Sequence, residues 1–176
     1  MSIGIGVIGT GVMGAEHARI LRHETPGAHL EGIFDANAAR AQAVASGAAV
    51  FSDPHSLIAS DQIDAIVIAS PDATHAPLTL ACIAAGKPVL CEKPLASSAA
   101  DALNVVQAEV ALGRRFIQVG YMRRFDPGYR EIKRVKDAGR LGRSRVAAQR
   151  APKRPRAGVV HRSDGCHELV RPRDRH

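Results

Sequence analysis

Short apolar segments alternate with helix-like patterns from residue 3 to about residue 139. Repeated strand–helix units of this kind form a parallel sheet with helices packed on its faces. The pattern therefore predicts an α/β fold with a doubly wound parallel sheet. Strands are expected at residues 3–8, 30–34, 49–51, 65–69, 89–91 and 116–120, and helices at residues 14–23, 38–45, 74–85 and 98–112.

The core of such a fold has to be built almost without aromatic side chains. Hydrophobic residues make up 45% of the chain, and aromatic residues only 3%. Aliphatic side chains suit the space between a parallel sheet and its helices, because the strands of such a sheet are buried on both faces. The composition thus agrees with the predicted layers of helix and sheet.

The net charge of +7 is concentrated at one end of the chain. Residues 1–139 contain 13 Lys and Arg against 14 Asp and Glu, a net charge of −1, whereas residues 140–176 carry +8. A basic surface can indicate nucleic-acid binding, but here the excess charge lies outside the strand–helix pattern and is not interleaved with aromatic residues. We therefore expect no nucleic-acid partner.

The last part of the chain differs in character from the rest. From about Gly142 onwards Arg and Pro are frequent, and neither a strand period nor a helix period is visible. A chain of 176 residues accommodates one domain and a fragment of a second. We expect a dinucleotide-type sheet domain over residues 1–120, the start of a second, α+β domain over residues 121–142, and an irregular or disordered tail over residues 143–176. Asp126 followed by Pro127 predicts a helix start in the middle segment.

Other sequence features bear on compartment and metal binding. No apolar run approaches the roughly 18 residues that cross a bilayer, and no basic leader precedes the first apolar segment. We expect a cytoplasmic protein without a membrane partner. Cys82, Cys91 and Cys166 form no CxxC pair, so Cys82 and Cys91 are interpreted as buried small hydrophobic residues. The spacing of Cys166, His167 and His161 matches no common metal site, and no metal is expected.

A glycine-rich turn follows the first expected strand: residues 9–14 are Gly-Thr-Gly-Val-Met-Gly and lead directly into a helix-like segment. In a GxGxxG motif, Gly9 permits the tight turn, Gly11 lets the backbone approach a pyrophosphate, and Gly14 lets helix and strand pack closely. The phosphates then lie at the helix N-terminus, beside Val12 and Met13. Six strands and this motif together predict a dinucleotide-binding Rossmann domain.

An acidic residue, Asp35, stands 21 positions after Gly14, at the end of the second expected strand. A carboxylate in this place accepts hydrogen bonds from both ribose hydroxyls of NAD. It would repel the 2′-phosphate of NADP, and residues 36–38 supply no base, so NAD is the expected cofactor and NADP the less favoured one. Arg40, close by, leaves NADP open as an alternative. The other interpretation of Asp35 is a helix cap.

Two further loops follow the fourth expected strand and the fifth. Ser70, Pro71 and His75 lie in the first loop, and Glu92 and Lys93 lie in the second. Open α/β sheets bind ligands at the carboxyl ends of their strands, so both loops are expected at the cofactor cleft. Taken singly, His75 could be a helix-start residue, and Lys93 could be a solvated surface residue.

Four motifs occur together in this part of the chain: the glycine motif, residues 71–75 (Pro-Asp-Ala-Thr-His), residues 85–87 (Ala-Gly-Lys) and residues 92–94 (Glu-Lys-Pro). Together they resemble the N-terminal domain of the Gfo/Idh/MocA oxidoreductases, and the similarity extends from residue 3 to about residue 142. Glu-Lys-Pro in this context is far more specific than the glycines. Residues 119–129 are similar to the inositol 2-dehydrogenase branch of that family.

The resemblance implies roles for individual residues. Lys93 would lie beside the nicotinamide and hydrogen-bond the reacting hydroxyl, as the catalytic residue of this part of the chain. Glu92 would help to hold the nicotinamide-side ribose, and His75 would lie near the ring. Met122 and Arg123 would face the substrate cleft, the alternative for Arg123 being a solvated basic residue. The substrate would be a polyol or sugar, with myo-inositol as a candidate, and the full-length family members are expected to form homo-oligomers.

Such a dehydrogenase passes a hydride from an alcohol carbon to NAD while a general base removes the hydroxyl proton. The resemblance implies that an Asp-x-x-x-His element of the second domain supplies this base. The nearest match here, Asp164 to His167, is one residue too short. We therefore expect the 176-residue chain, as a truncated or altered member, to bind dinucleotide and to oxidise polyols poorly. A noncatalytic NAD-binding module is the alternative function.

Overall fold

A computed structural model of the chain describes residues 2–140. Two compact units are distinguished along the chain, Met1–Arg130 and Glu131–His176. The structure describes the second unit for residues 131–140 only. The expectations for the Arg- and Pro-rich tail, including those for His161, Cys166 and His167, lie outside the described residues.

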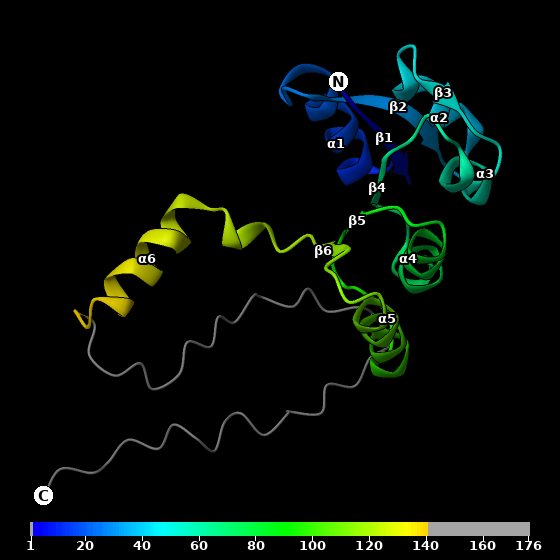
Figure 1. The fold of residues 1–176 in the computed structure, drawn as a ribbon. Helices are drawn as coiled ribbons and strands as arrows, with labels where there is room; N and C mark the ends of the chain where they lie inside the picture. The colour runs from blue at the N-terminus through cyan, green and yellow to red at the C-terminus, as the bar shows by residue number, and fades with distance from the viewer. Residues whose placement is uncertain (1, 141–176) are drawn as a thin grey trace, which may run out of the picture. The chain divides into compact units, whose positions relative to one another are not determined.

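The first unit is built on one six-stranded parallel sheet with the strand order β3-β2-β1-β4-β5-β6 (Figure 1). All five neighbouring pairs are parallel. Both the doubly wound sheet and the Rossmann fold predicted from the sequence are confirmed. The strands are β1 (Ile3–Ile8), β2 (Ala28–Phe34), β3 (Ala49–Val50), β4 (Ala65–Ile68), β5 (Val89–Cys91) and β6 (Ile117–Val119).

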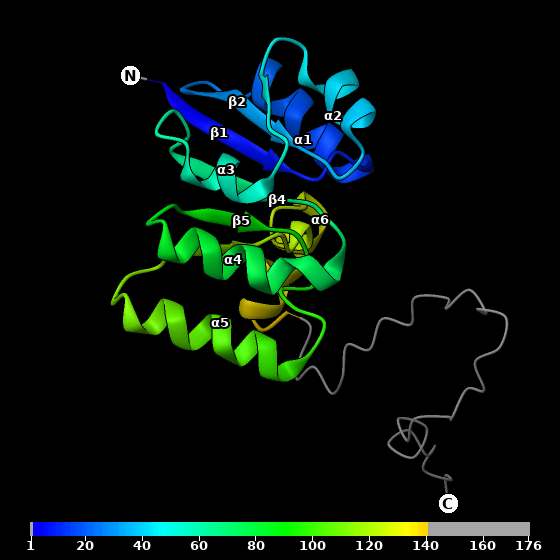
Figure 2. The same ribbon diagram turned by 90° about the vertical axis from the view of Figure 1, so that its right-hand side faces the viewer.

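Helices pack on both faces of this sheet. Figure 2 shows α3, α4 and α5 in a row along one face, whereas α1 and α2 contact each other and the β1–β2 side of the sheet. These helices are α1 (Val12–His23), α2 (Ala38–Ala45), α3 (Pro54–Ala59), α4 (His75–Ala84) and α5 (Ala99–Ala111). The described residues also form the short 3₁₀ turns η1 (Asp72–Thr74) and η2 (Met122–Arg124) and a further helix, α6 (Pro127–Asp137).

Alternation along the strands divides the core into two layers. Val7 belongs to one fully buried cluster with Ala18 of α1 and Ala41 of α2. Its neighbour Ile8 belongs to the other cluster, with Leu57 of α3 and several residues of β4, α4 and β5. Successive side chains of a strand point to opposite faces, so a continuous apolar strand serves both layers.

Side-chain caps explain where several helices begin. Asn37, Asp53 and Ser98 each accept a hydrogen bond from the backbone nitrogen three residues later, at the starts of α2, α3 and α5. The N-cap of α2 is therefore Asn37, and the interpretation of Asp35 as that cap is wrong. Helix α3 was not expected from the sequence, because six residues are too few to show a helical period, although Asp53 followed by Pro54 is a helix-start signal.

The expected helix at Asp126 and Pro127 is present. Asp126 Oδ1 accepts hydrogen bonds from the backbone nitrogens of Gly128 and Tyr129, at 2.9 and 3.2 Å, and α6 begins at Pro127. Proline is well suited to the first helical position because its missing N–H would have no partner there.

The two described cysteines behave as small hydrophobic residues. Cys82 on α4 and Cys91 on β5 are fully buried and are not joined in a disulfide. Burial raises the pKa of the Cys82 thiol to about 12 and that of the Cys91 thiol to about 11, so neither forms a thiolate near neutral pH. The sequence-based interpretation of these two residues is confirmed.

The strand order determines where a ligand can bind. The chain runs outwards in one direction from β1 through β2 to β3, and in the other direction from β4 through β5 to β6. At such a reversal, the loops after neighbouring strands turn away from each other and leave a crevice at the carboxyl edge of the sheet. The loops that follow β1, β2, β4 and β5 all lie along that edge.

Candidate functional site

The turn after β1 requires glycine at two of its three glycine positions. Gly9 has a φ of +90°, and a Cβ there would lie 2.6 Å from the backbone nitrogen of Ser70. A Cβ at Gly14 would lie 1.8 Å from the carbonyl oxygen of Gly9. The turn, the start of α1 and the end of β4 are therefore packed backbone to backbone, as the sequence motif predicts.

Gly11 differs from the other two glycines of the motif. Apart from its own atoms and those of its chain neighbours, no atom lies within 4 Å of the position that a Cβ would take there. Gly11 is also a lining residue of the cleft described below. Packing within the described part of the protein does not require this glycine, which agrees with a role in close approach to a ligand.

Helix α1 begins immediately after Gly11, two residues earlier than expected from the sequence. The side chains of Val12 and Met13, in its first turn, are exposed. The first backbone N–H groups of a helix have no partners within the helix, and with the helix dipole they form a site for phosphate. The turn is thus suited to a pyrophosphate.

Asp35 follows β2 and is bonded to the glycine-rich turn. Its Oδ2 accepts hydrogen bonds from the backbone nitrogen and the hydroxyl of Thr10, at 2.7 and 2.8 Å. Its Oδ1 accepts one from the backbone nitrogen of Asn37, at 2.8 Å. Burial opposes ionisation of this carboxyl, but these hydrogen bonds and the nearby Arg40 guanidinium outweigh it and lower its pKa.

Arg40, the basic residue that left NADP open, lies next to Asp35. Its Nη1 is 3.8 Å from Asp35 Oδ2, and about half of its side chain is exposed. A guanidinium in this place could contact a 2′-phosphate, but the Asp35 carboxylate, which is its ion-pair partner, would repel the same phosphate.

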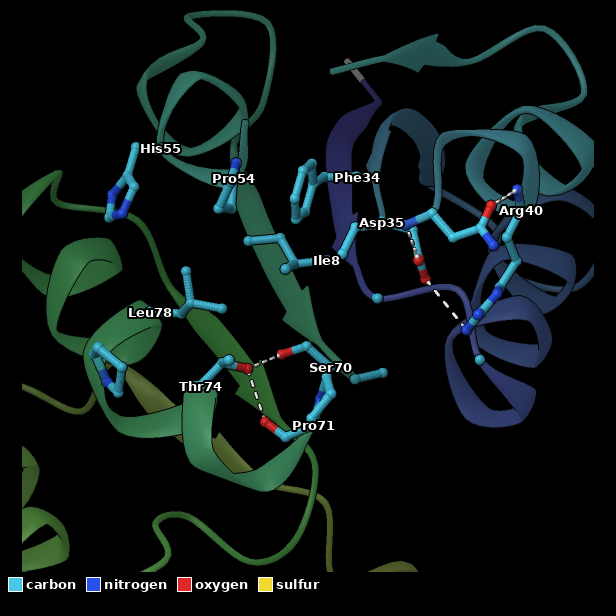
Figure 3. Close-up of a pocket in the computed structure, with 16 residues that line it drawn as sticks. Ile8, Phe34, Asp35, Arg40, Pro54, His55, Ser70, Pro71, Thr74 and Leu78 are labelled. Atoms are coloured by element: carbon cyan, nitrogen blue, oxygen red, sulfur yellow. Dashed lines mark hydrogen bonds and ion pairs between the residues drawn. The ribbon is translucent and has the colours of Figure 1, made fainter. Parts of the chain in front are cut away.

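A cleft of about 750 Å³ opens at the carboxyl edge of β1, β2 and β4. Figure 3 shows Asp35 and Arg40 on one side of it, and His55 and Leu78 on the opposite side. Most of the lining is apolar. The lining residues are Ile8, Gly9, Gly11, Phe34, Asp35, Ala36, Asn37, Arg40, Pro54, His55, Ala69, Ser70, Pro71, Thr74, Pro77 and Leu78.

Five of the expected cofactor residues line this cleft, namely Gly9, Gly11, Asp35, Ser70 and Pro71. The apolar wall formed by α3 and α4 was missed in the sequence, because it depends on the unexpected helix α3. The available signal was the helix start at Asp53 and Pro54.

His75 is buried beside the cleft and does not line it. The residue is 1% exposed, and its ring has Nδ1 2.6 Å from the carbonyl oxygen of Pro94 and Nε2 2.8 Å from that of Ser70. The ring therefore joins the loop after β4 to the loop after β5. Nearby, the hydroxyls of Ser70 and Thr74 are 2.6 Å apart, and that of Thr74 donates to the carbonyl oxygen of Pro71 (Figure 3).

Glu92 and Lys93 follow β5, one strand farther along the same edge. Lys93 is exposed, and its peptide bond to Pro94 is cis. The Glu92 carboxylate is largely buried, and its Oε1 lies 3.0 Å from Nε2 of His17, a residue of α1. His17 was not expected at the site from the sequence, because nothing local marks a histidine inside a helix as a partner of a residue 75 positions away.

Met122 and Arg123, expected at the substrate cleft, lie in η2 after β6. Both side chains are exposed. The Arg123 guanidinium is 3.4 Å from Asp126 Oδ2 and stacks 5.1 Å from the centre of the Tyr129 ring. The structure thus places Arg123 in a local cluster with the start of α6, at the carboxyl edge of the sheet.

The described residues contain neither a metal-binding cluster nor a membrane-spanning helix. Between residues 2 and 140, no three or more His, Cys, Asp or Glu side chains come together in a way that could hold a metal ion. Within the same range, every helix is too short or too polar to cross a membrane.

The sequence profile of the "Oxidoreductase family, NAD-binding Rossmann fold" matches residues 3–121. The chain belongs to the Gfo/Idh/MocA oxidoreductase family. This membership confirms the resemblance inferred from the glycine motif and the Glu-Lys-Pro motif.

Curated relatives are named as inositol dehydrogenases. The chain is 54% identical to "Inositol 2-dehydrogenase 1" of Saccharopolyspora erythraea over 146 residues, which cover 81% of this chain and 43% of that protein. It is also 54% identical to "Inositol 2-dehydrogenase" of Rubrobacter xylanophilus over 142 residues, covering 80% and 41%. The chain thus spans less than half the length of these relatives.

Solved structures of similar proteins agree with this assignment. The structure of myo-inositol dehydrogenase from Lactobacillus casei, in complex with NAD(H) and myo-inositol, has a TM-score of 0.77 and 34% identity, covering 81% of this chain and 43% of that one. The structure of scyllo-inositol dehydrogenase from the same organism, with NAD(H) and scyllo-inositol, has a TM-score of 0.77 and 29% identity, with the same coverage.

Proposed function

We propose that this chain forms the NAD-binding part of an inositol dehydrogenase that oxidises a ring hydroxyl of myo-inositol or a closely related polyol. The observation that carries the proposal is the position of Asp35, which lines one cleft together with Gly11 at the carboxyl edge of the sheet. A dinucleotide needs both features, a carboxylate for a ribose and an approachable backbone for the pyrophosphate.

The cleft offers a separate place to each group of the adenosine half. The pyrophosphate would lie on the turn at Gly11, against the first N–H groups of α1. The adenosine ribose would hydrogen-bond to Asp35, whose depressed pKa keeps it an acceptor at neutral pH. The apolar wall that includes His55 and Leu78 suits a flat purine ring.

The nicotinamide half would extend towards the loop after β5. Glu92 would accept a hydrogen bond from the second ribose, and exposed Lys93 would hydrogen-bond the reacting hydroxyl of the polyol. His75 supports this end, because its buried ring lies between the two loops, with its nitrogens within hydrogen-bond distance of the Pro94 and Ser70 carbonyl oxygens. Met122 and Arg123 would complete the substrate side of the cleft.

NAD, when bound, accepts the hydride from the alcohol carbon. Lys93 can orient the hydroxyl and stabilise charge on its oxygen, and the proton passes to a base from the second domain of the longer relatives. The Asp-x-x-x-His element expected to supply that base has its nearest match at Asp164 to His167, which is one residue shorter. Because this spacing does not match the element, we propose that the 176-residue chain binds NAD and turns over polyols slowly. A noncatalytic NAD-binding module is the second candidate.

Two measurements on one purified sample test these proposals. Calorimetric titration with NAD and with NADP is expected to show binding of NAD and weaker binding of NADP. Reduction of NAD at 340 nm is then followed with myo-inositol, scyllo-inositol and glucose as substrates. Tight NAD binding without any turnover would favour the noncatalytic module, and so would the absence of turnover when residues 1–142 are joined to the second domain of a longer relative. Failure to bind NAD would contradict both candidates.

A further inference from the structure

His17 and Glu92 form a contact between two elements that the cofactor would bridge. His17 lies in the second turn of α1, the helix that begins at the glycine-rich turn, and Glu92 directly follows β5. Nε2 of His17 is 3.0 Å from Oε1 of Glu92. The side chains are 23% and 12% exposed, respectively, so water screens this pair less than an exposed pair.

Gly120, at the end of β6, leaves room for the same carboxylate. A Cβ at Gly120 would lie 3.0 Å from both Cδ and Oε2 of Glu92, and 3.1 Å from Oε1. These distances are tighter than ordinary van der Waals contacts. The carboxylate is thus enclosed by α1 on one side and by the backbone after β6 on the other.

The position of Glu92 after β5 indicates which half of the cofactor its carboxylate would contact. Asp35 follows β2, on one side of the β1–β4 reversal, and Glu92 follows β5, on the other side. A dinucleotide bound across the reversal puts its two nucleotide halves on the two sides. With adenosine at Asp35, the nicotinamide half lies on the side of Glu92.

We propose that His17 is a positioning residue that holds the Glu92 carboxylate ready for the nicotinamide-side ribose. The inference rests on the proposed function, because it assumes that NAD binds with this orientation. His17 Nε2 donates to Oε1, and Oε2 accepts only a long hydrogen bond, at 3.4 Å, from the backbone nitrogen of Lys93, so Oε2 keeps a lone pair that can accept from the ribose. The hydrogen bond from His17 also keeps the long Glu92 side chain in one rotamer, so that less conformational entropy is lost when the cofactor binds.

The test compares NAD with ADP, which contains only the adenosine half and the diphosphate. In the full 176-residue chain, His17→Ala is expected to weaken NAD binding about tenfold, the loss expected for one hydrogen bond to a charged group, and to leave ADP binding within about twofold. His17→Gln places an amide N–H near the position of Nε2 and is expected to restore most of the NAD affinity. In a Glu92→Ala background, the same His17→Ala change is expected to have no further effect on NAD binding.

A matched control is available at the opposite edge of the sheet. His29 Nε2 is 3.0 Å from Glu31 Oε2, the same distance as in the His17 pair, but near the start of β2. His29→Ala is expected to leave both NAD and ADP affinities unchanged. Gly120→Ala, which intrudes on the Glu92 carboxylate, is expected to weaken NAD binding selectively, as His17→Ala does.

The outcomes separate this inference from the proposed function. Equal losses of NAD and ADP affinity in His17→Ala would show an effect on α1 or on the whole fold and would overturn the positioning role. Unchanged NAD affinity would overturn it as well. If the unsubstituted chain binds ADP but not NAD, or neither, the proposed function fails and the inference fails with it.

Discussion

The Asp35 carboxylate receives two hydrogen bonds from Thr10, one from its backbone nitrogen at 2.7 Å and one from its hydroxyl at 2.8 Å. The residue proposed to recognise the ribose therefore also holds the turn proposed to bind the pyrophosphate. Substitutions of Asp35 should affect cofactor specificity, cofactor affinity and the conformation of the turn together.

Asp35→Ala is expected to weaken NAD binding by about tenfold or more, because a charged hydrogen-bond acceptor is lost. The same change should bring NADP affinity closer to that of NAD, since the charge that repels the 2′-phosphate is removed and Arg40 is released from its partner. Calorimetric titration of both cofactors measures the ratio. An unchanged NAD-to-NADP ratio in the variant would remove Asp35 from the cofactor site.

Gly11→Ala and Gly14→Ala are expected to separate cofactor binding from stability. A Cβ at Gly11 meets no atom within 4 Å, so the melting temperature should stay near that of the unsubstituted chain while NAD affinity falls. A Cβ at Gly14 would lie 1.8 Å from a backbone oxygen, and displacing that backbone is expected to cost about 3 kcal/mol or more of unfolding free energy. Thermal unfolding with and without NAD measures both effects, and a normal melting temperature in Gly14→Ala would contradict the backbone contact.

His75→Ala is expected to lower the stability of the fold, whereas His55→Ala is expected to lower the affinity for NAD. Loss of the buried His75 ring removes the hydrogen-bonding ring between the Pro94 and Ser70 carbonyl oxygens and creates a cavity, a cost of about 3 kcal/mol in unfolding free energy. His55 is exposed and lines the cleft. Its removal should change stability by less than about 0.5 kcal/mol and weaken NAD binding roughly fivefold through the lost ring contact.

Urea titrations measure the stabilities of these two histidine variants, and cofactor titrations measure their affinities. A stable His75→Ala protein would contradict its role in joining the two loops. Full NAD affinity in His55→Ala would place the purine ring elsewhere in the cleft.

The depressed pKa of Asp35 predicts a contribution to acid stability. Burial raises this pKa, but the hydrogen bonds from Asn37 and Thr10 and the charge of Arg40 together lower it by more than burial raises it, so the net shift is downwards. A carboxyl whose pKa is lower in the folded state stabilises the fold fully above the unfolded-state pKa, near 4. This contribution is lost as the pH falls from there through the folded-state pKa.

The measurement is the free energy of unfolding between pH 2.5 and pH 6, for the unsubstituted chain and for Asp35→Asn. The difference between the two proteins should be largest at pH 6 and should shrink as the pH is lowered. A difference that does not depend on pH would show that Asp35 ionises alike in the folded and unfolded states.

Local patterns in the sequence determined most of the secondary structure and much of the site. The strand–helix alternation and the glycine motif predicted the Rossmann fold, and Asp126 with Pro127 predicted the start of α6. These features depend on neighbouring residues, which specify capping, turns and the burial of alternate side chains. Helix α3 was not predicted, because its six residues make fewer than two full turns and show no helical period; only its N-cap residue carried a signal.

The tertiary structure alone decided which of the expected residues share a cleft and which support it from behind. Gly9, Gly11, Asp35, Ser70 and Pro71 line the cavity, whereas His75 is enclosed by the carbonyl groups of two loops. The contact of His17 with Glu92 spans 75 positions. Such contacts depend on the order of the strands, which brings α1, β4 and β5 together, and a burial pattern within one segment holds no information about the segment that will lie beside it.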